Sequence, residues 1–373
     1  MQRNIRRSLR LEFQGKTLEE NYALGDFYLD GDLADTDFHI FSSEHGFMGL
    51  FPMGKRRFRM IASNPLSRPS KDTEPALEEL QKIYDMRSHI PARLRDMSWS
   101  SWFRIISRMI NHLQQRRVFL GGDAAHIHSP TGAQGMNTGI QDMINLCWKL
   151  AMVIHGKASP KLLDTYGEDR IPVIRNVLTK TERLTAAIGS ENPVFRTIFN
   201  HVAPLVVGTE FVQEKSAARM SQVALNYRES SLSETHGYHG SLRAGDRVPD
   251  MTLRVMNKAG GAEQAPREVR LFSLLDPSRF TLFYVNVDDP AALHAEIQAK
   301  LAAWQGFIDA YQIAPVESDA VESKHFASVF GSSPGMVLMR PDSYVAFMGE
   351  ADSVPHLAAS CLSGCFSKPQ GVV

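Results

Sequence analysis

Apolar and polar residues alternate along much of the first third of the chain. The stretches "NYALGDFYLDGD" and "DFHIFSSEHGFMGLFPMGKRRFRMIAS" show the alternation, and turns containing Gly31, Gly46 and Gly54 interrupt it. A period of two, broken by turn residues, is typical of strands that bury one face. The pattern therefore predicts an antiparallel sheet over about residues 12–62.

Three further segments follow this predicted sheet. Residues 63–73 are rich in proline and serine and predict a loop, whereas residues 75–90 carry apolar side chains at helical spacing. Residues 97–110 predict another buried strand, whose aromatic side chains we expect in the core rather than around a substrate. These aromatic residues are Trp99, Trp102 and Phe103.

The next segment, "RRVFLGGDAAHIHSPTGAQGMNTGIQDMINLCWKL", predicts a strand, a turn and a helix in that order. The short apolar run 118–120 is the expected strand, and Asn137 or Thr138 would cap a helix that starts near Gly139. A second helix, over 162–188, is expected to be interrupted at Pro172. Several apolar residues share one face of the first helix. They are Met143, Leu146, Leu150, Val153 and Ile154.

A polar segment rich in glycine and serine at 230–245 predicts a domain boundary. Beyond it, 280–287 predicts a strand, 291–305 a helix and 334–349 a hairpin, which together indicate a small α/β domain. We therefore expect an α+β protein with two domains. The first covers 1–235, with a sheet at about 12–110 and helices at about 115–235, and the second covers 236–373.

Composition excludes several classes of function. The 373 residues contain 41 Lys and Arg against 41 Asp and Glu, so the formal net charge is zero. This balance gives no support to a nucleic-acid or polybasic membrane contact. No apolar run approaches the roughly 20 residues of a membrane span, and the basic first residues lack the apolar core of a secretory signal. We expect a cytoplasmic protein, and its three cysteines are too few for a disulfide framework.

The glycine-rich segment also indicates chemistry. Gly122 follows a predicted strand and lets a ligand approach the backbone closely, and the Asp123 carboxylate can accept hydrogen bonds from ligand hydroxyl groups. Gly132 and Gly135 lie in a loop that leads into a helix N-terminus, where free N–H groups and the helix dipole favour a negative group such as a reduced flavin. The alternative is that the glycines only form turns and the aspartate only caps a helix.

The stretch from Gly121 to Ala151 resembles the second flavin motif of the single-component FAD-dependent aromatic hydroxylases, the class of phenol hydroxylase and para-hydroxybenzoate hydroxylase. Residues 166–172 resemble the Tyr-x-x-x-Arg-x-Pro segment of that family, and residues 13–30 and 46–62 resemble its substrate-domain sheet. Residues 244–250 and 335–347 resemble the thioredoxin-like tail of the phenol hydroxylase branch. The resemblance implies a truncated, para-hydroxybenzoate hydroxylase-like FAD-binding core with an antiparallel substrate sheet, followed by a thioredoxin-like domain without CxxC.

The same resemblance implies site residues. Asp123, next to Gly122, would bind the ribityl chain of FAD, and Arg6 matches the arginine of the family's middle motif. Further residues would lie along the isoalloxazine ring, and no catalytic side chain is assigned. The ring residues are Pro130, Gly132, Gly135, Met136 and Asn137.

The implied reaction uses NAD(P)H (NADH or NADPH) to reduce FAD, adds molecular oxygen at the flavin C4a and transfers one oxygen atom from the resulting hydroperoxide to a phenolic ring. The implied partners are a small aromatic substrate and molecular oxygen, and the family's usual dimers imply a homodimer.

The G-x-G-x-x-G loop that opens this family is not found in the sequence. We therefore expect roughly the first 150–180 residues of a full family member to be absent, and with them much of the parallel sheet that 118–120 should join. Three explanations compete: a misplaced start codon or gene fragment, which we favour, a short protein that needs a partner, or a reduced protein with another role. The competing function is a non-catalytic protein or partner-dependent subunit that binds a small aromatic ligand.

Other polar residues offer weaker hypotheses. His126 and His128 form an H-x-H pair, but the flavin interpretation leaves no reason to expect a metal. A run of arginines could bind an acidic substrate, although a solvated face is favoured, and three polar residues of the sheet could line a substrate cavity. The arginines are Arg56, Arg57 and Arg59, and the cavity candidates are Tyr22, Asp26 and His39. Cys361 and Cys365 lack the spacing of a redox pair.

Overall fold

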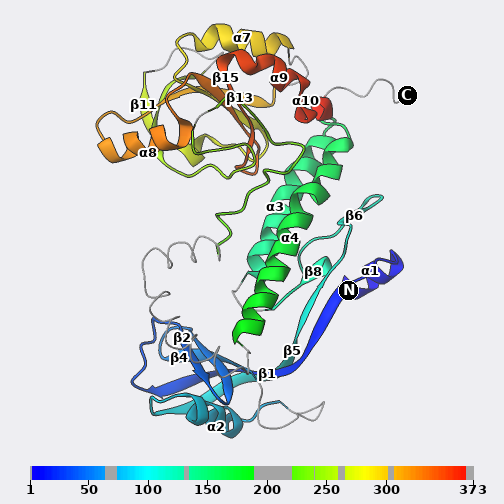
Figure 1. Ribbon diagram of the computed structural model, residues 1–373, viewed down its shortest axis with the longest axis vertical. Coiled ribbons are helices and arrows are strands. Elements are labelled where there is room, and N and C mark those ends of the chain that lie inside the picture. Colours follow the sequence, from blue (N-terminus) through cyan, green and yellow to red (C-terminus); the bar gives the residue numbers. More distant parts are fainter. Residues whose placement is uncertain are drawn as a thin grey trace. The chain divides into compact units, whose positions relative to one another are not determined.

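The computed structural model in Figure 1 describes residues 2–63, 74–129, 134–188, 221–238, 240–258, 265–300 and 306–366. The chain divides into two compact units, and each unit contains separate stretches of sequence. The first unit contains Met1–Asn111, Gly122–Met136 and Ile174–Met220, and the second contains His112–Gly121, Asn137–Val173 and Ser221–Val373.

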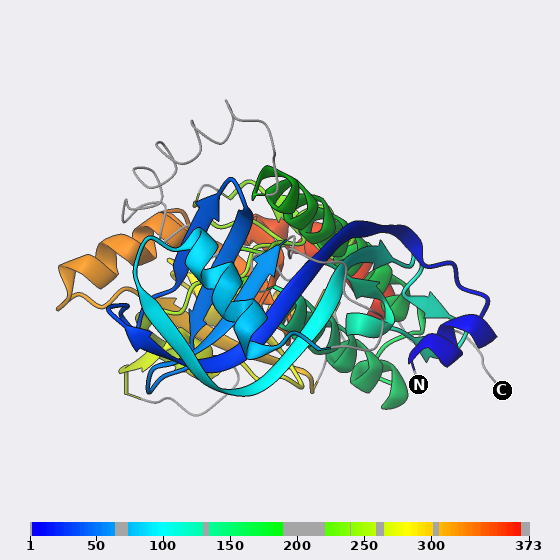
Figure 2. The same cartoon turned by 90° about the horizontal axis from the view of Figure 1, so that it is seen from below.

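The first unit is built on a six-stranded antiparallel sheet with the order β2-β3-β4-β1-β5-β8. Its strands are β1 (Gln14–Gly31), β2 (His39–Ser43), β3 (Gly46–Pro52), β4 (Arg57–Ser63), β5 (Ala92–Met109) and β8 (His126–Ile127). β1 and β5 each contain 18 residues and run side by side over most of their length (Figure 2). The predicted antiparallel sheet is present, and β5 begins earlier than the apolar pattern indicated. The unit also contains the short helix α1 (Gln2–Ser8).

Helix α2 (Leu77–Arg87) packs on one face of this sheet and buries Leu80, Ile83 and Tyr84. Its start is stabilised by the Glu79 carboxylate, which accepts a hydrogen bond from the backbone N–H of Ala76 at 3.0 Å. Each large apolar side chain that is fully buried here contributes about 1.5–3 kcal/mol. The predicted helix is therefore confirmed. The predicted loop lies outside the described residues, apart from Ser63 at the end of β4.

Gly25 of β1 allows α2 to approach the sheet. A Cβ atom placed on Gly25 would lie 2.3 Å from Cδ1 of Leu80, far inside normal contact distance. Any side chain at this position would push the helix away from the sheet.

Three details of the glycine-rich region differ from expectation. The strand expected to join a parallel sheet is β7 (Val118–Phe119), which, within the described ranges, pairs with β6 (Gln114–Gln115) in a two-stranded antiparallel hairpin. Helix α3 (Gly135–Ile154) begins four residues before Gly139, so Asn137 and Thr138 lie inside the helix and not at its cap. Glycine is tolerated in a helix interior, where it costs about 1 kcal/mol relative to alanine, so a helix that starts at Gly135 continues through Gly139.

Helix α4 (Lys161–Ile188) continues through Pro172 without interruption, contrary to expectation. A proline in a helix interior removes one backbone hydrogen bond and costs about 3 kcal/mol. Asp169 and Arg170, just before the proline, form fully buried ion pairs, and these tertiary contacts offset that local cost.

The second unit contains a seven-stranded sheet with the order β11-β10-β13-β12-β14-β15-β9. Its strands are β9 (Glu234–His236), β10 (Thr252–Lys258), β11 (Arg267–Arg270), β12 (Phe280–Val285), β13 (Ile308–Ala314), β14 (Gly335–Met339) and β15 (Val345–Glu350). Its helices include α7 (Pro290–Lys300), α8 (Ala320–Phe330), α9 (Val354–Ala359), α10 (Cys361–Phe366) and the 3-10 helices η2 (Leu271–Leu274) and η4 (Ala351–Ser353). The predicted hairpin is confirmed as β14 and β15, and residues 301–305 of the predicted helix lie outside the described residues.

A buried network of charged side chains joins α3 and α4 to the turn between β14 and β15. One carboxylate oxygen of Asp169 accepts hydrogen bonds from Lys149 Nζ and from Arg340 Nη2, each at 2.8 Å. Arg340 also donates to both oxygens of Asp342, at 2.9 and 2.6 Å. These four side chains are at most 1% exposed, so two carboxylates and two cations neutralise one another away from water.

Burial favours the neutral form of Asp169, but the neighbouring Arg340 and Lys149 outweigh this effect and hold its pKa below the usual range. A second buried pair lies beside the network, where Arg170 Nε donates to Asp142 at 2.7 Å. Arg170 also donates to the Tyr227 hydroxyl at 3.0 Å. The helices and the C-terminal sheet are therefore held together by charged contacts as well as by apolar packing.

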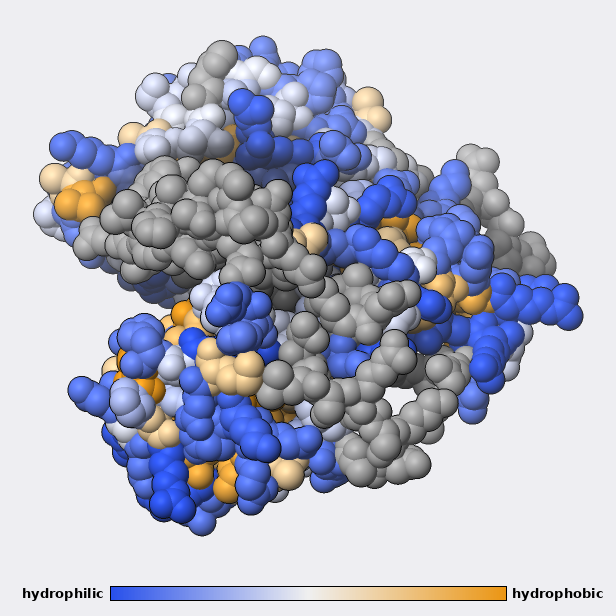
Figure 3. All heavy atoms as spheres, turned by 60° about the horizontal axis from the view of Figure 1, so that its bottom comes forward, coloured by the Kyte–Doolittle hydropathy of each residue, from blue (hydrophilic) through white to orange (hydrophobic). Residues whose placement is uncertain are grey.

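Apolar residues lie in separate patches on the hydrophilic surface shown in Figure 3. Trp99 is 47% exposed, so the expectation that it lies in the core was wrong, whereas Trp102 and Phe103 are half-buried. Trp99 sits on β5 directly opposite Asp26, and the other face of the sheet carries α2 and the apolar core. Among the described residues, no helix combines the length and apolar character needed to cross a membrane.

The network yields a test of stability. Replacing Arg340 by methionine leaves Asp169 and Asp342 buried with only Lys149 to balance them, so we expect a loss of about 3–5 kcal/mol in the free energy of unfolding. Urea unfolding followed by circular dichroism measures this loss.

The matched control is Arg270→Met, because Arg270 pairs with Asp250 at 2.9 Å but is 55% exposed. An exposed pair contributes at most about 1 kcal/mol, so this variant should remain close to the parent chain. Equal losses of unfolding free energy in the two variants would show that the buried network stabilises the fold no more than an exposed ion pair does.

Candidate functional site

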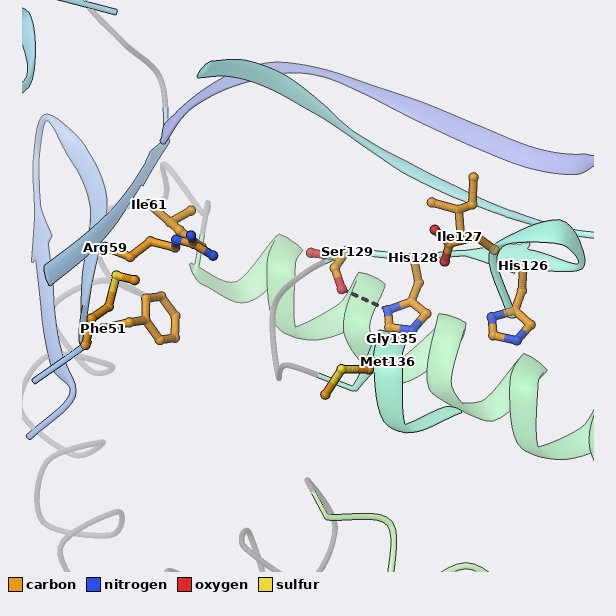
Figure 4. Close-up of a pocket in the computed structure, with 11 residues that line it drawn as sticks. Phe51, Arg59, Ile61, His126, Ile127, His128, Ser129, Gly135 and Met136 are labelled. Atoms are coloured by element: carbon orange, nitrogen blue, oxygen red, sulfur yellow. Dashed lines mark hydrogen bonds between the residues drawn. The ribbon is translucent and has the colours of Figure 1, made fainter. Parts of the chain in front are cut away.

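A pocket of about 540 Å³ lies in the first unit, between the sheet and the segment that leads into α3 (Figure 4). This volume is within the range of about 300–1,000 Å³ that is typical of small-molecule and cofactor sites. The sheet side of the pocket is mostly apolar, and the opposite side carries histidine, serine and aspartate. The lining residues are Phe51, Met53, Arg59, Ile61, Asp123, His126, Ile127, His128, Ser129, Gly135 and Met136.

The polar wall is attached to the sheet through β8. Ile127 pairs with Arg108 and His126 with Met109, at the end of β5. Before β8 the chain forms the 3-10 helix η1 (Gly122–Ala124), which Gly122 enters with φ +55°. This left-handed conformation favours glycine and explains why Gly122 precedes Asp123.

Arg6 supports this part of the wall from α1. Its Nη1 donates to the backbone carbonyl oxygens of Asp123 at 3.1 Å and Ala124 at 2.8 Å. The guanidinium also lies 3.9 Å from the ring centre of Phe13. Arg6 thus binds the backbone below Asp123, whose own side chain is exposed at the pocket.

In the second unit, Gly121 and the Tyr-x-x-x-Arg-x-Pro segment form close contacts with the chain before η1. A Cβ atom on Gly121 would lie 2.3 Å from the Met143 methyl carbon and 2.9 Å from the Tyr166 hydroxyl. That hydroxyl donates to the carbonyl oxygen of Leu120 at 3.0 Å. The glycine is required because the chain packs directly against the helices here.

His128 carries a buried acceptor that has no hydrogen-bond partner among the described residues. Its Nδ1 lies 2.9 Å from the carbonyl oxygen of Ser129, and a carbonyl only accepts, so Nδ1 must carry the hydrogen. Nε2 is then an unprotonated acceptor, and it is buried without a hydrogen-bond partner in the part of the chain that the structure describes. The ring lies parallel to that of His126, with a 6.3 Å separation of centres.

Burial lowers the pKa of His128, with a smaller lowering contribution from His126, although the Ser129 carbonyl and Asp123 favour the charged form. The imidazole is therefore neutral near pH 7. From the sequence, His126 and His128 were a candidate metal-ligand pair, and this acceptor was not predicted. The period-two spacing of the two histidines was the signal that their side chains lie on the same side of an extended chain, as the parallel rings show.

The first residues of α3 complete this side of the pocket. Gly135 and Met136 both line it, and Met136 is 76% exposed. Among the described residues, the His128 ring alone comes within 4 Å of the position of a Gly135 Cβ, at 3.6 Å. The N–H groups of a first helical turn lack helical partners, which favours a negative group by about 0.3–1 kcal/mol.

On the sheet side, Arg59 is held in place by Asp26, its direct cross-strand neighbour. Its Nε and Nη2 donate to the two carboxylate oxygens at 2.7 and 2.8 Å, and the guanidinium lies 5.8 Å from the ring centre of Trp99. Arg56 instead donates to the backbone carbonyls of Leu29 and Gly31. Arg56 and Arg59 therefore both have specific partners, while the Arg59 side chain remains 43% exposed, as expected for a solvated face.

The structure brings together Asp123, Gly135 and Met136 at one pocket, with Gly122 beside Asp123 and Arg6 behind it. Asn137 follows Met136 in the first turn of α3, and Pro130 and Gly132 lie outside the described residues. The three cavity candidates on the sheet are not among the described residues that line the pocket. These are Tyr22, Asp26 and His39. Within the described ranges, no group of three His, Cys, Asp or Glu residues comes together to hold a metal.

Two family models match the chain. The FAD binding domain model matches residues 3–181, and the model for the C-terminal region of aromatic-ring hydroxylases matches residues 241–369. The chain is 31% identical over 354 residues to a flavin-dependent monooxygenase of Mycobacteroides abscessus and 31% identical over 300 residues to the pentachlorophenol 4-monooxygenase of Sphingobium chlorophenolicum. These alignments cover 93% and 78% of this chain.

A solved structure agrees with these matches. The aromatic hydroxylase CabE from angucycline biosynthesis superimposes with a TM-score of 0.65 at 25% identity, covering 92% of this chain and 64% of that one. The chain therefore belongs to the FAD-dependent aromatic-ring hydroxylases and has their para-hydroxybenzoate hydroxylase-like fold. It spans 62% and 51% of the lengths of the two relatives.

The state of His128 can be tested by titration. We expect nitrogen-15 imidazole spectra near pH 7 to show His128 as the neutral tautomer protonated at Nδ1, and its pKa to lie below the ordinary value of 6.5. Because the unfolded chain binds this proton more readily, His128 should stabilise the folded state above that value and lose its contribution as the pH falls.

The control is His128→Asn, which identifies the signal and removes the titration. A His128 signal that titrates above 6.5 would contradict the proposed state of the ring.

Proposed function

We propose that the chain forms the substrate sheet and part of the flavin site of an FAD- and NAD(P)H-dependent monooxygenase that hydroxylates a phenolic ring. The observation that carries this proposal is the pocket in which Asp123, His128 and the start of α3 face an apolar sheet wall. Its relatives support the reaction class, since they include a pentachlorophenol 4-monooxygenase. The activity of the whole protein is inferred, because the chain covers only part of those relatives.

The residues of the polar wall fit FAD. The exposed Asp123 carboxylate can accept hydrogen bonds from the ribityl hydroxyls, and among the described residues the His128 ring alone lies close to the backbone of Gly135, beside which a flat ring could lie. The buried Nε2 of His128 lacks a partner among the described residues, and a ligand N–H or O–H would satisfy it. When bound, FAD would supply the electrons taken from NAD(P)H and the activation of molecular oxygen.

The sheet wall fits an aromatic substrate. Phe51 and Ile61 offer apolar surface against which a ring can pack, and Arg59 provides donors for a phenolic or phenolate oxygen. Because the guanidinium is already fixed by Asp26, it would orient the substrate with little loss of side-chain freedom. These residues bind and orient the ring and exclude water, while the redox chemistry belongs to the cofactor.

Further features of the proposal follow from the family resemblance. Residues 1–235 would form the FAD- and substrate-binding domain, and residues 236–373 a thioredoxin-like domain without a redox pair. In the second domain, β12 and β13 are parallel and β12 and β14 are antiparallel, which is consistent with such a domain. A cytoplasmic homodimer completes the proposal.

FAD titration tests the cofactor site. We expect the full chain to change the visible absorbance and fluorescence of FAD with micromolar or tighter affinity, about −8 kcal/mol. Asp123→Ala should weaken binding at least tenfold, because a hydrogen bond to a charged group contributes about 1.5–3 kcal/mol. Oxidation of NADPH that increases with a phenolic substrate would support the proposed reaction.

Asp288→Ala is the matched control, since Asp288 is exposed and does not line the pocket. It should bind FAD like the parent chain. If the folded parent chain does not bind FAD, the proposed function fails in favour of a non-catalytic protein that binds an aromatic ligand.

A further inference from the structure

A second pocket, of about 250 Å³, is lined by residues of the second unit. It forms where residues 223–228 meet residues 241–249 and the end of α8. Its volume is below the roughly 300–1,000 Å³ that is typical of larger ligands, so it suits a ligand of only a few heavy atoms. The lining residues are Val223, Ala224, Leu225, Asn226, Arg228, Ser241, Leu242, Asp246, Arg247, Pro249 and Val329.

Gly245 lets the two segments of the pocket approach each other closely. It has φ +88°, which favours glycine, and a Cβ atom there would lie 2.4 Å from the backbone nitrogen of Arg228. Its carbonyl oxygen accepts a hydrogen bond from the backbone N–H of Tyr227, and its own N–H donates to the carbonyl oxygen of Val345, each at 2.7 Å. Val345 is the first residue of β15, so this wall of the pocket is attached to the C-terminal sheet.

The charge of Asp246 in this pocket is already paired. Its two carboxylate oxygens accept hydrogen bonds from Nε and Nη2 of Arg228 at 2.6 and 2.9 Å, and one of them also accepts from the backbone N–H of Arg243 at 3.0 Å. Asp246 is the only acidic residue among the described residues that line the pocket, which also include two arginines. The lining therefore carries one net positive charge, which attracts anions.

Arg247 is the arginine of the pocket that has no acceptor. No hydrogen bond or ion pair connects its guanidinium to a residue in the described part of the chain, and its Nε is buried without a partner. The guanidinium lies 5.7 Å from the ring centre of Phe272, and the backbone of Arg247 forms an antiparallel bridge with Tyr344. A half-buried cation that is held in place in this way is satisfied only when a water or a ligand supplies acceptor oxygens.

We propose that this pocket binds a small organic carboxylate and that Arg247 binds the charged group. The paired N–H groups of a guanidinium match the two oxygens of a carboxylate in one plane. A single positive charge balances a carboxylate better than a phosphate group, which carries about 1.5–2 negative charges near pH 7. Apolar side chains offer a surface for the rest of the ligand. They are Val223, Leu242, Pro249 and Val329.

A saturation-transfer NMR titration of the full chain with sodium butyrate, at constant ionic strength, tests the site. We expect a dissociation constant of about 1 mM or tighter. Arg247→Gln should weaken binding at least tenfold, because hydrogen bonds to a charged group are lost. Arg247→Lys keeps the charge but not the planar pair of donors, so it should also bind butyrate more weakly than the parent chain. The measurement involves no flavin and is independent of the proposed function.

Arg267→Gln is the matched control, because it removes the same charge from an exposed arginine of β11 that is not among the described residues lining the pocket. It should bind butyrate like the parent chain, and all three variants should keep the parent's circular dichroism spectrum. If Arg247→Gln does not fold, Arg247→Lys provides the comparison. Absence of butyrate binding to the parent chain, or equal binding by the folded Arg247 variants, would overturn the proposal. Tighter binding of inorganic phosphate than of butyrate would also overturn it and identify a phosphate site instead.

Discussion

The contact of Asp169 with Arg340 and Lys149 is the constraint on which much of the second unit depends. It connects residues that are far apart in sequence and lie on α3, α4 and the β14–β15 turn. Ionic groups without water must be matched closely in number and position, so the network permits only one rotation of α3. Apolar contacts alone would allow sliding and rotation more readily, because they have little directionality.

Local pattern predicted the parts of the fold that depend on neighbours in sequence. The alternation in residues 12–62, the helix at Leu77–Arg87 and the hairpin at 334–349 were all found. Three predictions were wrong: the start of α3 near Gly139, the interruption of α4 at Pro172 and the place of β7 in a parallel sheet. Tertiary contacts override local preference at these points. Arg340 gave no signal of its role, since its partner Asp169 lies 171 residues away.

The residues of the pocket also divide into those that a local sequence pattern predicted and those that only tertiary contacts bring there. Asp123, Gly135 and Met136 were chosen from one glycine-rich stretch, and the structure brings them to one pocket. Arg59 reaches that pocket only through the register of β1 and β4, which no local pattern specifies. The acceptor nitrogen of His128, which has no partner in the described part of the chain, depends on which ring nitrogen meets the Ser129 carbonyl, a detail that only the folded geometry provides.

The length of β1 and β5 has a mechanical consequence for this pocket. β4 pairs with β1 only over Tyr22–Tyr28, whereas residues 14–17 of β1 pair with the end of β5 that also carries β8. The two walls of the pocket are therefore joined by a narrow two-stranded ribbon, which has a register shift between Thr17 and Asn21. A ribbon of two strands twists more than a wide sheet, and a bulge bends it further. Bending of this ribbon would change the distance between the wall that contains Phe51 and the wall that contains His128. The width of the pocket therefore depends on how far the two long strands bend.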